Sequence, residues 1–299
     1  MQQKKISIIG AGAVGSTIAY SLMLKNVPCE ISLVDIDTVR CRGEILDLSD
    51  TLINQGGQST LSYGSADDAG KSDIIIIAAG ERQKVGQSRL GLLEKNKEII
   101  QSIIATIEPI NKQAIIIMVS NPVDYMAFFA QKYSKLPHCQ VIGSGTFLDT
   151  QRLRQEISKK TNISQDSIHA YVIGEHGDNQ FAAWSSANIA GKPLIDFKFT
   201  DKELETMSKT ARDKAYEIIA CKGSTYYGIA SCVAALCRTV IFDQKRVTPV
   251  SCFVEKYQLY MSLPVVLGAQ GVESIIDIPL SSKESKQLDE CAQVMQKSI

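Results

Sequence analysis

Hydrophobic residues in the first half of the chain form short, nearly continuous runs, with segments of helical spacing between them. Apolar runs of this kind that end in polar turns are typical of buried strands. Strands are predicted at 6–9, 30–34, 60–62, 73–78, 114–119 and 140–142, and helices at segments that include 16–25 and 90–107. Because strands and helices alternate, the pattern indicates an α/β fold with a parallel, doubly wound sheet that helices cover on both faces.

The pattern changes near Gly143-Ser144-Gly145-Thr146, after which strands and helices no longer alternate regularly. We therefore predict two domains, residues 1–143 with the doubly wound sheet and residues 144–299 with an α+β arrangement. In the second domain, helices are expected at 147–159, 202–220, 221–241 and 281–299, and strands at 168–173, 246–253 and 259–267. Thr146 is expected to cap the first of these helices.

The composition is that of an ordinary globular protein, with 299 residues, 44% of them hydrophobic and 21% charged. Lys plus Arg and Asp plus Glu both number 32, so the charge balance predicts neither a nucleic-acid nor a membrane partner. The longest aliphatic runs, 74–79 and 114–119, are too short to span a bilayer. The eight cysteines are scattered, with no Cys-x-x-Cys pair. Since no signal-peptide pattern precedes the first strand, we expect free thiols, no metal site and a cytoplasmic protein.

A glycine-rich turn, Gly10-Ala11-Gly12-Ala13-Val14-Gly15, joins the first predicted strand to a predicted helix. In this position Gly10 permits a tight turn, Gly12 lets a pyrophosphate approach the backbone, and Gly15 lets the helix pack closely on the strand. Asp35 ends the next strand, 20 residues beyond Gly15, where its carboxylate can accept hydrogen bonds from ribose hydroxyls. The same carboxylate would repel a 2′-phosphate, so the predicted cofactor of this Rossmann sheet is NAD rather than NADP.

The segment Ile173-Gly174-Glu175-His176-Gly177-Asp178 ends an apolar run and places an imidazole in a loop between glycines. His176 is one of three histidines in the chain, and histidine titrates closer to neutral pH than any other side chain. It is therefore the candidate acid/base group. A lone histidine in a glycine loop is more often a surface residue, so this interpretation depends on the partners that the rest of the chain supplies.

Three other segments carry candidate contacts to a ligand. The polar segment 78–89 has glycines near both ends and several cations, so it is either a lid that closes over a substrate or a solvated basic loop. Asn121 follows the strand 114–119 and precedes a proline; its amide is placed to bind substrate or cofactor, although Asn-Pro is also ordinary turn chemistry. Thr225 and Ile229 lie one helical turn apart and either line a cleft or pack in the core.

On the predicted helix 147–159, Asp149 and Arg152 are three residues apart and share a face, whereas Arg154 points elsewhere. A carboxylate that reached His176 would fix the tautomer of the imidazole and raise its pKa. A guanidinium beside it would bind a substrate carboxylate bidentately. The alternative is a surface ion pair that contributes little energy.

Together these motifs resemble the lactate/malate dehydrogenase family, most closely its bacterial lactate-specific members. The likeness covers essentially the whole chain and rests on motifs in their expected order: GAGAVG with Asp35, AGERQKVGQSR, SNPVD, GTFLDTQRLR, IGEHGD and KGSTYYGIA. It implies an oxidoreductase of glycolysis and fermentation that transfers a hydride between NAD and a 2-keto/2-hydroxy acid.

The resemblance also implies a role for individual residues. His176 is the implied proton donor and acceptor, Asp149 its orienting partner, Arg152 the clamp on the substrate carboxylate, and Arg89 the group that polarises the substrate carbonyl. Further implied substrate contacts are Gln83, Asn121 and Thr225. The implied cofactor contacts are Gly10, Gly12, Ala13, Val14, Gly15, Asp35, Ala79, Gly80, Asn121 and Ile229.

Gln83 aligns with the position at which the malate members of this family carry an arginine for the second substrate carboxylate. A neutral amide leaves that charge unpaired, so the resemblance predicts pyruvate as the preferred substrate. The neighbouring Arg82 would supply a cation if the alignment shifted by one residue, and a malate or bulkier 2-hydroxy-acid dehydrogenase is therefore the alternative. A non-catalytic NAD-binding protein is the alternative from a different class.

Two cations outside the predicted active site are also candidates. Arg154 and His169 resemble the pair that binds fructose 1,6-bisphosphate between subunits in allosteric bacterial members, and two unrelated surface cations are the alternative. His169 lies seven residues before His176, roughly 20 Å of extended chain, and so belongs to a different site. The resemblance also implies a homo-oligomer, specifically a tetramer.

Overall fold

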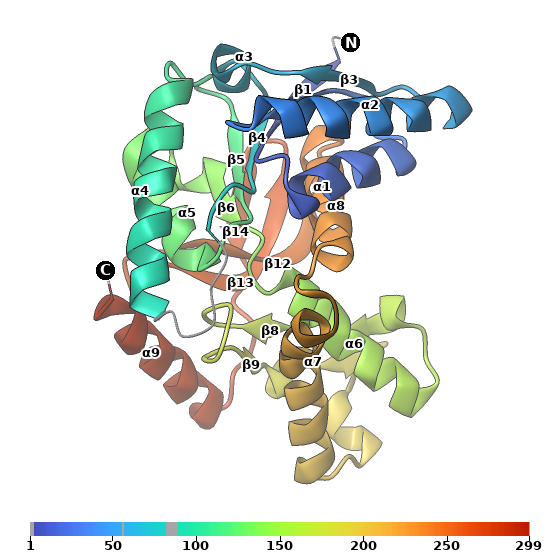
Figure 1. Cartoon of the computed structure of the whole chain (residues 1–299). Coiled ribbons are helices and arrows are strands. Elements are labelled where there is room, and N and C mark those ends of the chain that lie inside the picture. Colours follow the sequence, from blue (N-terminus) through green and yellow to red (C-terminus); the bar gives the residue numbers. More distant parts are fainter. Residues whose placement is uncertain (1–2, 56, 82–88, 299) are drawn as a thin grey trace.

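The computed structural model of the chain describes residues 3–55, 57–81 and 89–298. Within these residues the largest sheet has nine strands, in the order β14-β13-β12-β6-β5-β4-β1-β2-β3 (Figure 1). Its strands are β1 (Lys4–Ile9), β2 (Cys29–Val34), β3 (Thr60–Tyr63), β4 (Ile74–Ile77), β5 (Ile115–Met118), β6 (Val141–Gly143), β12 (Arg246–Val254), β13 (Leu259–Gly268) and β14 (Gly271–Ile275). The six neighbouring strands β3, β2, β1, β4, β5 and β6 are all parallel. Successive strands are added on one side of β1 up to β3 and on its other side from β4 onwards, so the strand order reverses between β1 and β4. The predicted doubly wound sheet is therefore confirmed.

Helices cover both faces of the parallel part, which explains why its central strands are apolar throughout. The first-half helices are α1 (Ala13–Leu24), α2 (Thr38–Gln55), α3 (Ala66–Gly70), α4 (Arg89–Ile107) and α5 (Val123–Ser134). In Figure 1, α1 and α2 lie on one face of the sheet, and α4 and α5 lie on the other. Every residue of β4 and β5 is buried between them. Three of these helices, α2, α3 and α5, were not among the predicted elements.

The second half is built from helices, antiparallel strands of the main sheet and short strand pairs. Its helices are α6 (Phe147–Thr161), α7 (Asp201–Lys222), α8 (Tyr227–Ile241) and α9 (Ser282–Gln296), and its short strands are β7 (Ile168–His169), β8 (Val172–Ile173), β9 (Phe181–Ala182), β10 (Asn188–Ile189) and β11 (Lys192–Pro193). β12 pairs with β6 through Ser251 and Gly143, so the main sheet continues beyond residue 143. The large core likewise includes α8, β12 and β13, whereas a smaller core lies under α6 and α7.

Three local predictions were wrong. The helix predicted at 221–241 begins only at Tyr227, because residues 221 and 222 belong to α7, and the other two errors lie at β8 and at the start of α6. The run 168–173 is not one strand, because β7 pairs with β10 while β8 pairs with β9 in a different sheet. Thr146 does not cap α6 with its side chain. Its Oγ1 instead donates to the carbonyl of Val172 at 2.5 Å, so it ties the start of α6 to β8. Contacts between segments distant in sequence thus override the local patterns.

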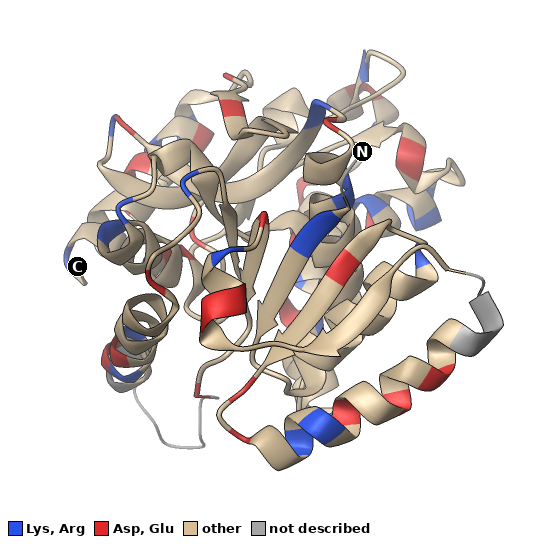
Figure 2. Ribbon diagram, turned by 90° about the horizontal axis from the view of Figure 1, so that it is seen from above, with Lys and Arg blue, Asp and Glu red and all other residues tan. Residues whose placement is uncertain are grey.

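The surface carries both signs of charge. Lys and Arg are scattered among Asp and Glu over the elements that Figure 2 displays, as expected for a chain with equal numbers of the two. Among the helices in the described ranges, none combines the length and apolar character needed to cross a lipid bilayer. The same ranges contain no group of three or more metal-binding side chains close enough to hold an ion.

Candidate active site

The glycine loop after β1 has the geometry that close backbone packing requires. Gly10 has a φ of +103°, and a Cβ on it would lie 2.6 Å from the backbone nitrogen of Ala79. A Cβ on Gly15 would lie 1.8 Å from the carbonyl oxygen of Gly10, so only glycine lets α1 approach β1 this closely. A Cβ on Gly12 would meet no atom within 4 Å. The space above the first turn of α1 is therefore open to a ligand such as a pyrophosphate.

Asp35 lies just beyond β2 and also organises the glycine loop. Its Oδ2 accepts a hydrogen bond from the backbone N–H of Ala11 at 2.6 Å, and its Oδ1 accepts one from the N–H of Asp37 at 2.9 Å. Each carboxylate oxygen has a second lone pair, so both can still accept from ribose hydroxyls. The open backbone at Gly12 and this carboxylate together fit a dinucleotide without a 2′-phosphate.

The other predicted cofactor residues border the same crevice. Ala13 and Val14 are half-buried in the first turn of α1, and Ala79 and Gly80 follow β4. The hydroxyl of Ser120, beyond β5, donates to the carbonyl of Ala79 at 2.5 Å. These contacts bring together the carboxyl ends of β1, β4 and β5, where doubly wound sheets bind their ligands.

The loop that carries His176 begins as β8 ends. Gly174 pairs with Ser262 of β13 through two backbone hydrogen bonds, of 3.0 and 2.9 Å. Gly174 and Gly177 have φ values of +97° and +143°, which side chains with a Cβ rarely adopt. The chain therefore turns sharply on both sides of His176, and 29% of the histidine side chain remains exposed to solvent.

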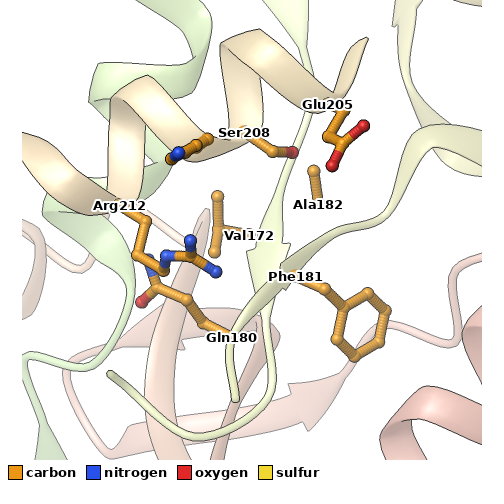
Figure 3. Close-up of a pocket in the computed structure, with 8 residues that line it drawn as sticks. Val172, Gln180, Phe181, Ala182, Glu205, Ser208 and Arg212 are labelled. Carbon is orange, nitrogen blue, oxygen red and sulfur yellow. The ribbon is translucent and has the colours of Figure 1, made fainter. Parts of the chain in front are cut away.

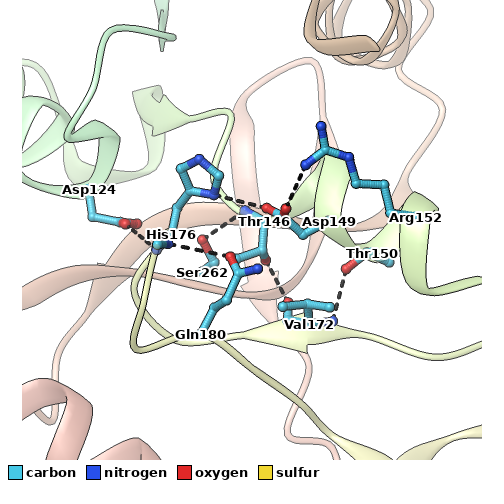
Figure 4. Close-up of polar contacts among 10 residues, drawn as sticks. Asp124, Thr146, Asp149, Thr150, Arg152, Val172, His176, Gln180 and Ser262 are labelled. Carbon is cyan, nitrogen blue, oxygen red and sulfur yellow. Dashed lines mark hydrogen bonds and ion pairs between the residues drawn. The ribbon is translucent and has the colours of Figure 1, made fainter. Parts of the chain in front are cut away.

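His176, Asp149 and Arg152 form one connected group (Figure 4). His176 Nδ1 lies 2.9 Å from Asp149 Oδ2, and Arg152 donates from a terminal guanidinium nitrogen to Asp149 Oδ1 at 3.2 Å. Asp149 and Arg152 come from α6 and are 1% and 8% exposed. The structure thus brings a loop and a helix together so that one buried carboxylate contacts both an imidazole and a guanidinium.

The environments of Asp149 and His176 favour the charged forms of both. Burial alone would raise the pKa of Asp149, but the nearby His176 and Arg152 outweigh it, so the pKa lies below its ordinary value. Burial alone would lower the pKa of His176, but the charge and hydrogen bond of Asp149 outweigh it, so the pKa lies above its ordinary value. An imidazolium is thereby stabilised near neutral pH, as a general acid requires.

The structure describes the remaining predicted substrate residues only in part. Asn121 is exposed beyond β5, and its carbonyl accepts a hydrogen bond of 2.7 Å from the side chain of Asn96 in α4. Thr225 is half-exposed before α8, and Ile229 packs partly against the large core. Gln83 lies outside the described residues. Arg89 begins α4, but its side chain also lies outside what the structure describes.

Three residues of this region were missed in the sequence. Asn96 is fully buried, and its side chain joins the loops after β4 and β5. Gln180 is a hydrogen-bond partner of Asp149. Asp124 accepts a hydrogen bond of 2.7 Å from the backbone N–H of His176. Only Asp124 carried a signal, because it is a lone carboxylate in the apolar start of α5. The other two are recognisable only once the fold brings their partners together.

A separate cavity of about 140 Å³ lies between α7 and the β8–β9 pair (Figure 3). It is lined by Val172, Gln180, Phe181, Ala182, Glu205, Ser208, Lys209 and Arg212. His176, Asp149 and Arg152 are absent from this lining, although Gln180 connects it to Asp149. The cavity therefore lies behind the histidine loop and is not the site of the acid/base group.

Arg154 and His169 lie near each other but away from this group. Arg154 donates from Nε to the carbonyl of Ala170 at 3.1 Å, and its guanidinium lies 5.2 Å from the ring centre of Tyr171. His169 is exposed on β7, adjacent to Ala170 in the chain. Burial, and then the charge of the nearby Arg246, lower the pKa of Arg154, whereas Tyr171 and Asp166 raise it. Arg246 thus adds a cation to this region, and Asp166 adds an acid.

A doubly wound sheet with this glycine loop, next to an imidazole held by a buried carboxylate and a buried arginine, defines a dinucleotide-dependent oxidoreductase. Residues 4–143 match the family model for the lactate/malate dehydrogenase NAD binding domain. Residues 146–299 match the family model for the lactate/malate dehydrogenase alpha/beta C-terminal domain. The chain therefore belongs to the lactate/malate dehydrogenase family, and the predicted cofactor, NAD, is confirmed.

Individual relatives cover nearly the whole chain. An L-lactate dehydrogenase A of Rhizopus oryzae is 44% identical over 95% of this chain and 88% of its own length. An L-lactate dehydrogenase of Kosmotoga olearia is 42% identical over 99% of this chain and 95% of its own. The minor L-lactate dehydrogenase of Enterococcus mundtii, solved in a ligand-bound form, is 31% identical over 99% of this chain and 97% of its own, and superposes with a TM-score of 0.94.

Proposed function

We propose that this chain is an NAD-dependent L-lactate dehydrogenase that interconverts pyruvate and L-lactate. The observation that carries the proposal is the contact of His176 with Asp149 at 2.9 Å, beside the buried Arg152 and near the ends of the NAD-binding strands. Similarity to named L-lactate dehydrogenases over almost the full length supports the same conclusion. A non-catalytic NAD-binding protein would have no need for a buried carboxylate that raises the pKa of a histidine.

In the proposed reduction of pyruvate, the imidazolium of His176 donates its Nε2 proton to the C2 oxygen, and in lactate oxidation the neutral ring accepts it. Asp149 holds Nδ1–H and so directs Nε2 towards the substrate. Arg152 has donors beyond the one that contacts Asp149, and these bind the substrate carboxylate. Arg89 polarises the C2 carbonyl. When bound, the nicotinamide supplies or accepts the hydride.

The preference for pyruvate over oxaloacetate is proposed to depend on Gln83. The unmodified protein is expected to have the higher kcat/KM for pyruvate, because Gln83 provides no charge for the second carboxylate of oxaloacetate. Replacement of Gln83 by Arg is expected to shift the ratio of the two kcat/KM values towards oxaloacetate by about 10²-fold, as one new ion pair in a closed site would. The measurement is steady-state NADH oxidation with each substrate.

The matched control is Gln87→Arg, which adds the same charge to the same segment at another position. It is expected to leave the ratio near that of the unmodified protein. Equal kcat/KM values for pyruvate and oxaloacetate in the unmodified protein would refute the assignment of Gln83 and favour a broader 2-hydroxy-acid dehydrogenase.

An effector site for fructose 1,6-bisphosphate is proposed at Arg154 and His169. The nearby Arg246, which adds a cation beside Arg154, supports binding of a phosphorylated ligand. The bisphosphate is expected to lower the apparent KM for pyruvate severalfold, and Arg154→Gln is expected to abolish the response. Initial rates at low pyruvate, with and without the bisphosphate, are the measurement. If the bisphosphate left the apparent KM of the unmodified protein unchanged, the proposed effector site would be refuted.

We also propose that the chain forms a homo-oligomer and acts in the cytoplasm. Exposed apolar side chains on two helices, Val39 and Leu46 of α2 and Tyr216 and Ile219 of α7, support a homo-oligomer, proposed to be a tetramer. The eight free cysteines support a reducing, cytoplasmic location. A division at residues 143 and 144 into an NAD-binding domain and a substrate domain, and roles in glycolysis and fermentation, complete the proposal.

A further inference from the structure

A second buried carboxylate, Asp124, lies on the opposite side of His176 from Asp149 (Figure 4). Asp124 is in the first turn of α5 and is 1% exposed. Its Oδ2 accepts a hydrogen bond of 2.7 Å from the backbone N–H of His176. His176 is therefore held at two points by two acids, through its ring at Asp149 and through its peptide at Asp124.

Within the part of the chain that the structure describes, Asp124 forms no ion pair with a lysine or arginine. The charge near it that favours its ionised form is that of His176. The hydroxyl of Ser251, on β12, the backbone N–H of His176 and the charge of His176 lower the pKa of Asp124, whereas the nearby Glu175 raises it. Asp124 Oδ1 and Ser251 Oγ are both buried and have no hydrogen-bond partner among the described residues. Burial is the largest influence and raises the pKa of Asp124 to about 6.

A carboxylate in such a place is costly, because burial penalises its ionised form and a single peptide N–H compensates only part of that penalty. An asparagine would accept the same N–H through its amide oxygen and could donate its NH₂ to Ser251 Oγ, with no charge to bury. The hydrogen bond alone therefore does not account for an acid at this position. What the acid adds is a negative charge close to the imidazole of His176.

We infer that Asp124 is a positioning residue for His176, which anchors the histidine loop through Oδ2 and whose ionised carboxylate, together with Asp149, stabilises the imidazolium. The catalytic consequence rests on the proposed function, in which the imidazolium donates the proton to pyruvate. Three charged groups from two helices act on this histidine, Asp124 of α5 and Asp149 and Arg152 of α6, while Glu175, its neighbour in the loop, acts on Asp124. The two aspartates raise the pKa of His176, whereas Arg152 lowers it.

The direct test is the titration of His176, followed by NMR of the imidazole in the full-length protein. The chain has only three histidines, so replacing His138 and His169 singly assigns the signals. Replacement of Asp124 by Asn is expected to lower the midpoint of His176 by about one pH unit, as loss of a nearby opposite charge does. The matched control is Asp73→Asn. Asp73 pairs with Lys4 at 2.7 Å and directly precedes β4, at the opposite end of that strand from the candidate site. In this variant the midpoint of the His176 titration is expected to be unchanged.

A second variant keeps the test decisive if Asp124→Asn does not fold. In Ser251→Ala the hydroxyl that lowers the pKa of Asp124 is removed, so Asp124 is less ionised at neutral pH. The midpoint of His176 is expected to fall in this variant too, by less than in Asp124→Asn. Midpoints equal to those of the unmodified protein in the folded variants would overturn the inference.

The activity profile separates this inference from the proposed function. In Asp124→Asn, kcat/KM for pyruvate is expected to begin its decline at a pH lower by about one unit, so that it is about tenfold below the unmodified protein at high pH. At low pH, where His176 is protonated in both proteins, the two values are expected to converge. A purely structural defect would instead lower kcat/KM by the same factor at every pH. If the unmodified protein reduced no pyruvate, the proposed function would fail, while the NMR titration would still decide the role of Asp124.

Discussion

Replacement of His176 by Asn is expected to lower kcat for pyruvate reduction by about 10²- to 10⁴-fold, the range that a general acid or base contributes. An amide can occupy the place of the imidazole and can donate a hydrogen bond to the C2 oxygen. It cannot transfer a proton at neutral pH, because it has no titratable nitrogen. The measurement is steady-state oxidation of NADH at saturating pyruvate, with the affinity for NADH obtained separately from its fluorescence.

The affinity for NADH is expected to be unchanged in this variant, since Gly10, Gly12 and Asp35 are untouched. The matched control is His138→Gln. The ring of His138 stacks on Phe253 at 3.7 Å between ring centres and is not part of the candidate site, so this variant is expected to retain the activity of the unmodified protein. A His176→Asn variant with more than a tenth of the original kcat would mean that another group supplies the proton.

Replacement of Arg152 by Leu is expected to lower kcat/KM for pyruvate by about 10³-fold, equivalent to roughly 4 kcal/mol, chiefly through a higher KM. The guanidinium is the buried cation nearest the His176–Asp149 pair, and its loss leaves the substrate carboxylate unpaired in a site with little water. Replacement by Lys keeps the charge but not the two parallel donors, so a smaller loss is expected. Steady-state kinetics over a wide range of pyruvate concentration measures both.

The control for Arg152 removes a different guanidinium from a helix of the same half. Arg212 of α7 pairs with Asp213 at 3.0 Å and lines the cavity behind the histidine loop. The Arg212→Leu variant is expected to keep the KM of the unmodified protein. Melting temperatures of all variants are needed, because Arg152 also stabilises the charge of the buried Asp149. A well-folded Arg152→Leu variant with an unchanged KM would contradict the proposed clamp.

Features that depend on neighbours in sequence were predictable. The apolar strands β4 and β5, the tight turn at Gly10 and the close approach at Gly15 all follow from short segments whose chemistry allows few alternatives. The shared face of Asp149 and Arg152 follows from helical spacing in the same way, and the structure places the two side chains 3.2 Å apart.

Features that depend on the pairing of distant segments were not predictable. Thr146 reads as a helix cap, yet its hydroxyl bonds to the carbonyl of Val172, and this preference is visible only when α6 and β8 are adjacent. The run 168–173 reads as one strand because its residues are apolar, although its two ends pair in different sheets. Asp124 was not singled out in the sequence, and only the fold reveals that it accepts a hydrogen bond from the peptide N–H of His176.

The central claim is that this protein transfers a hydride from NADH to C2 of pyruvate while a protein group protonates the oxygen. The most direct measurement uses NADH deuterated at both C4 positions, with pyruvate in ordinary water, and NMR of the product. L-lactate that carries one deuterium at C2 is the predicted result. The absence of lactate, or lactate with only hydrogen at C2, would contradict the account.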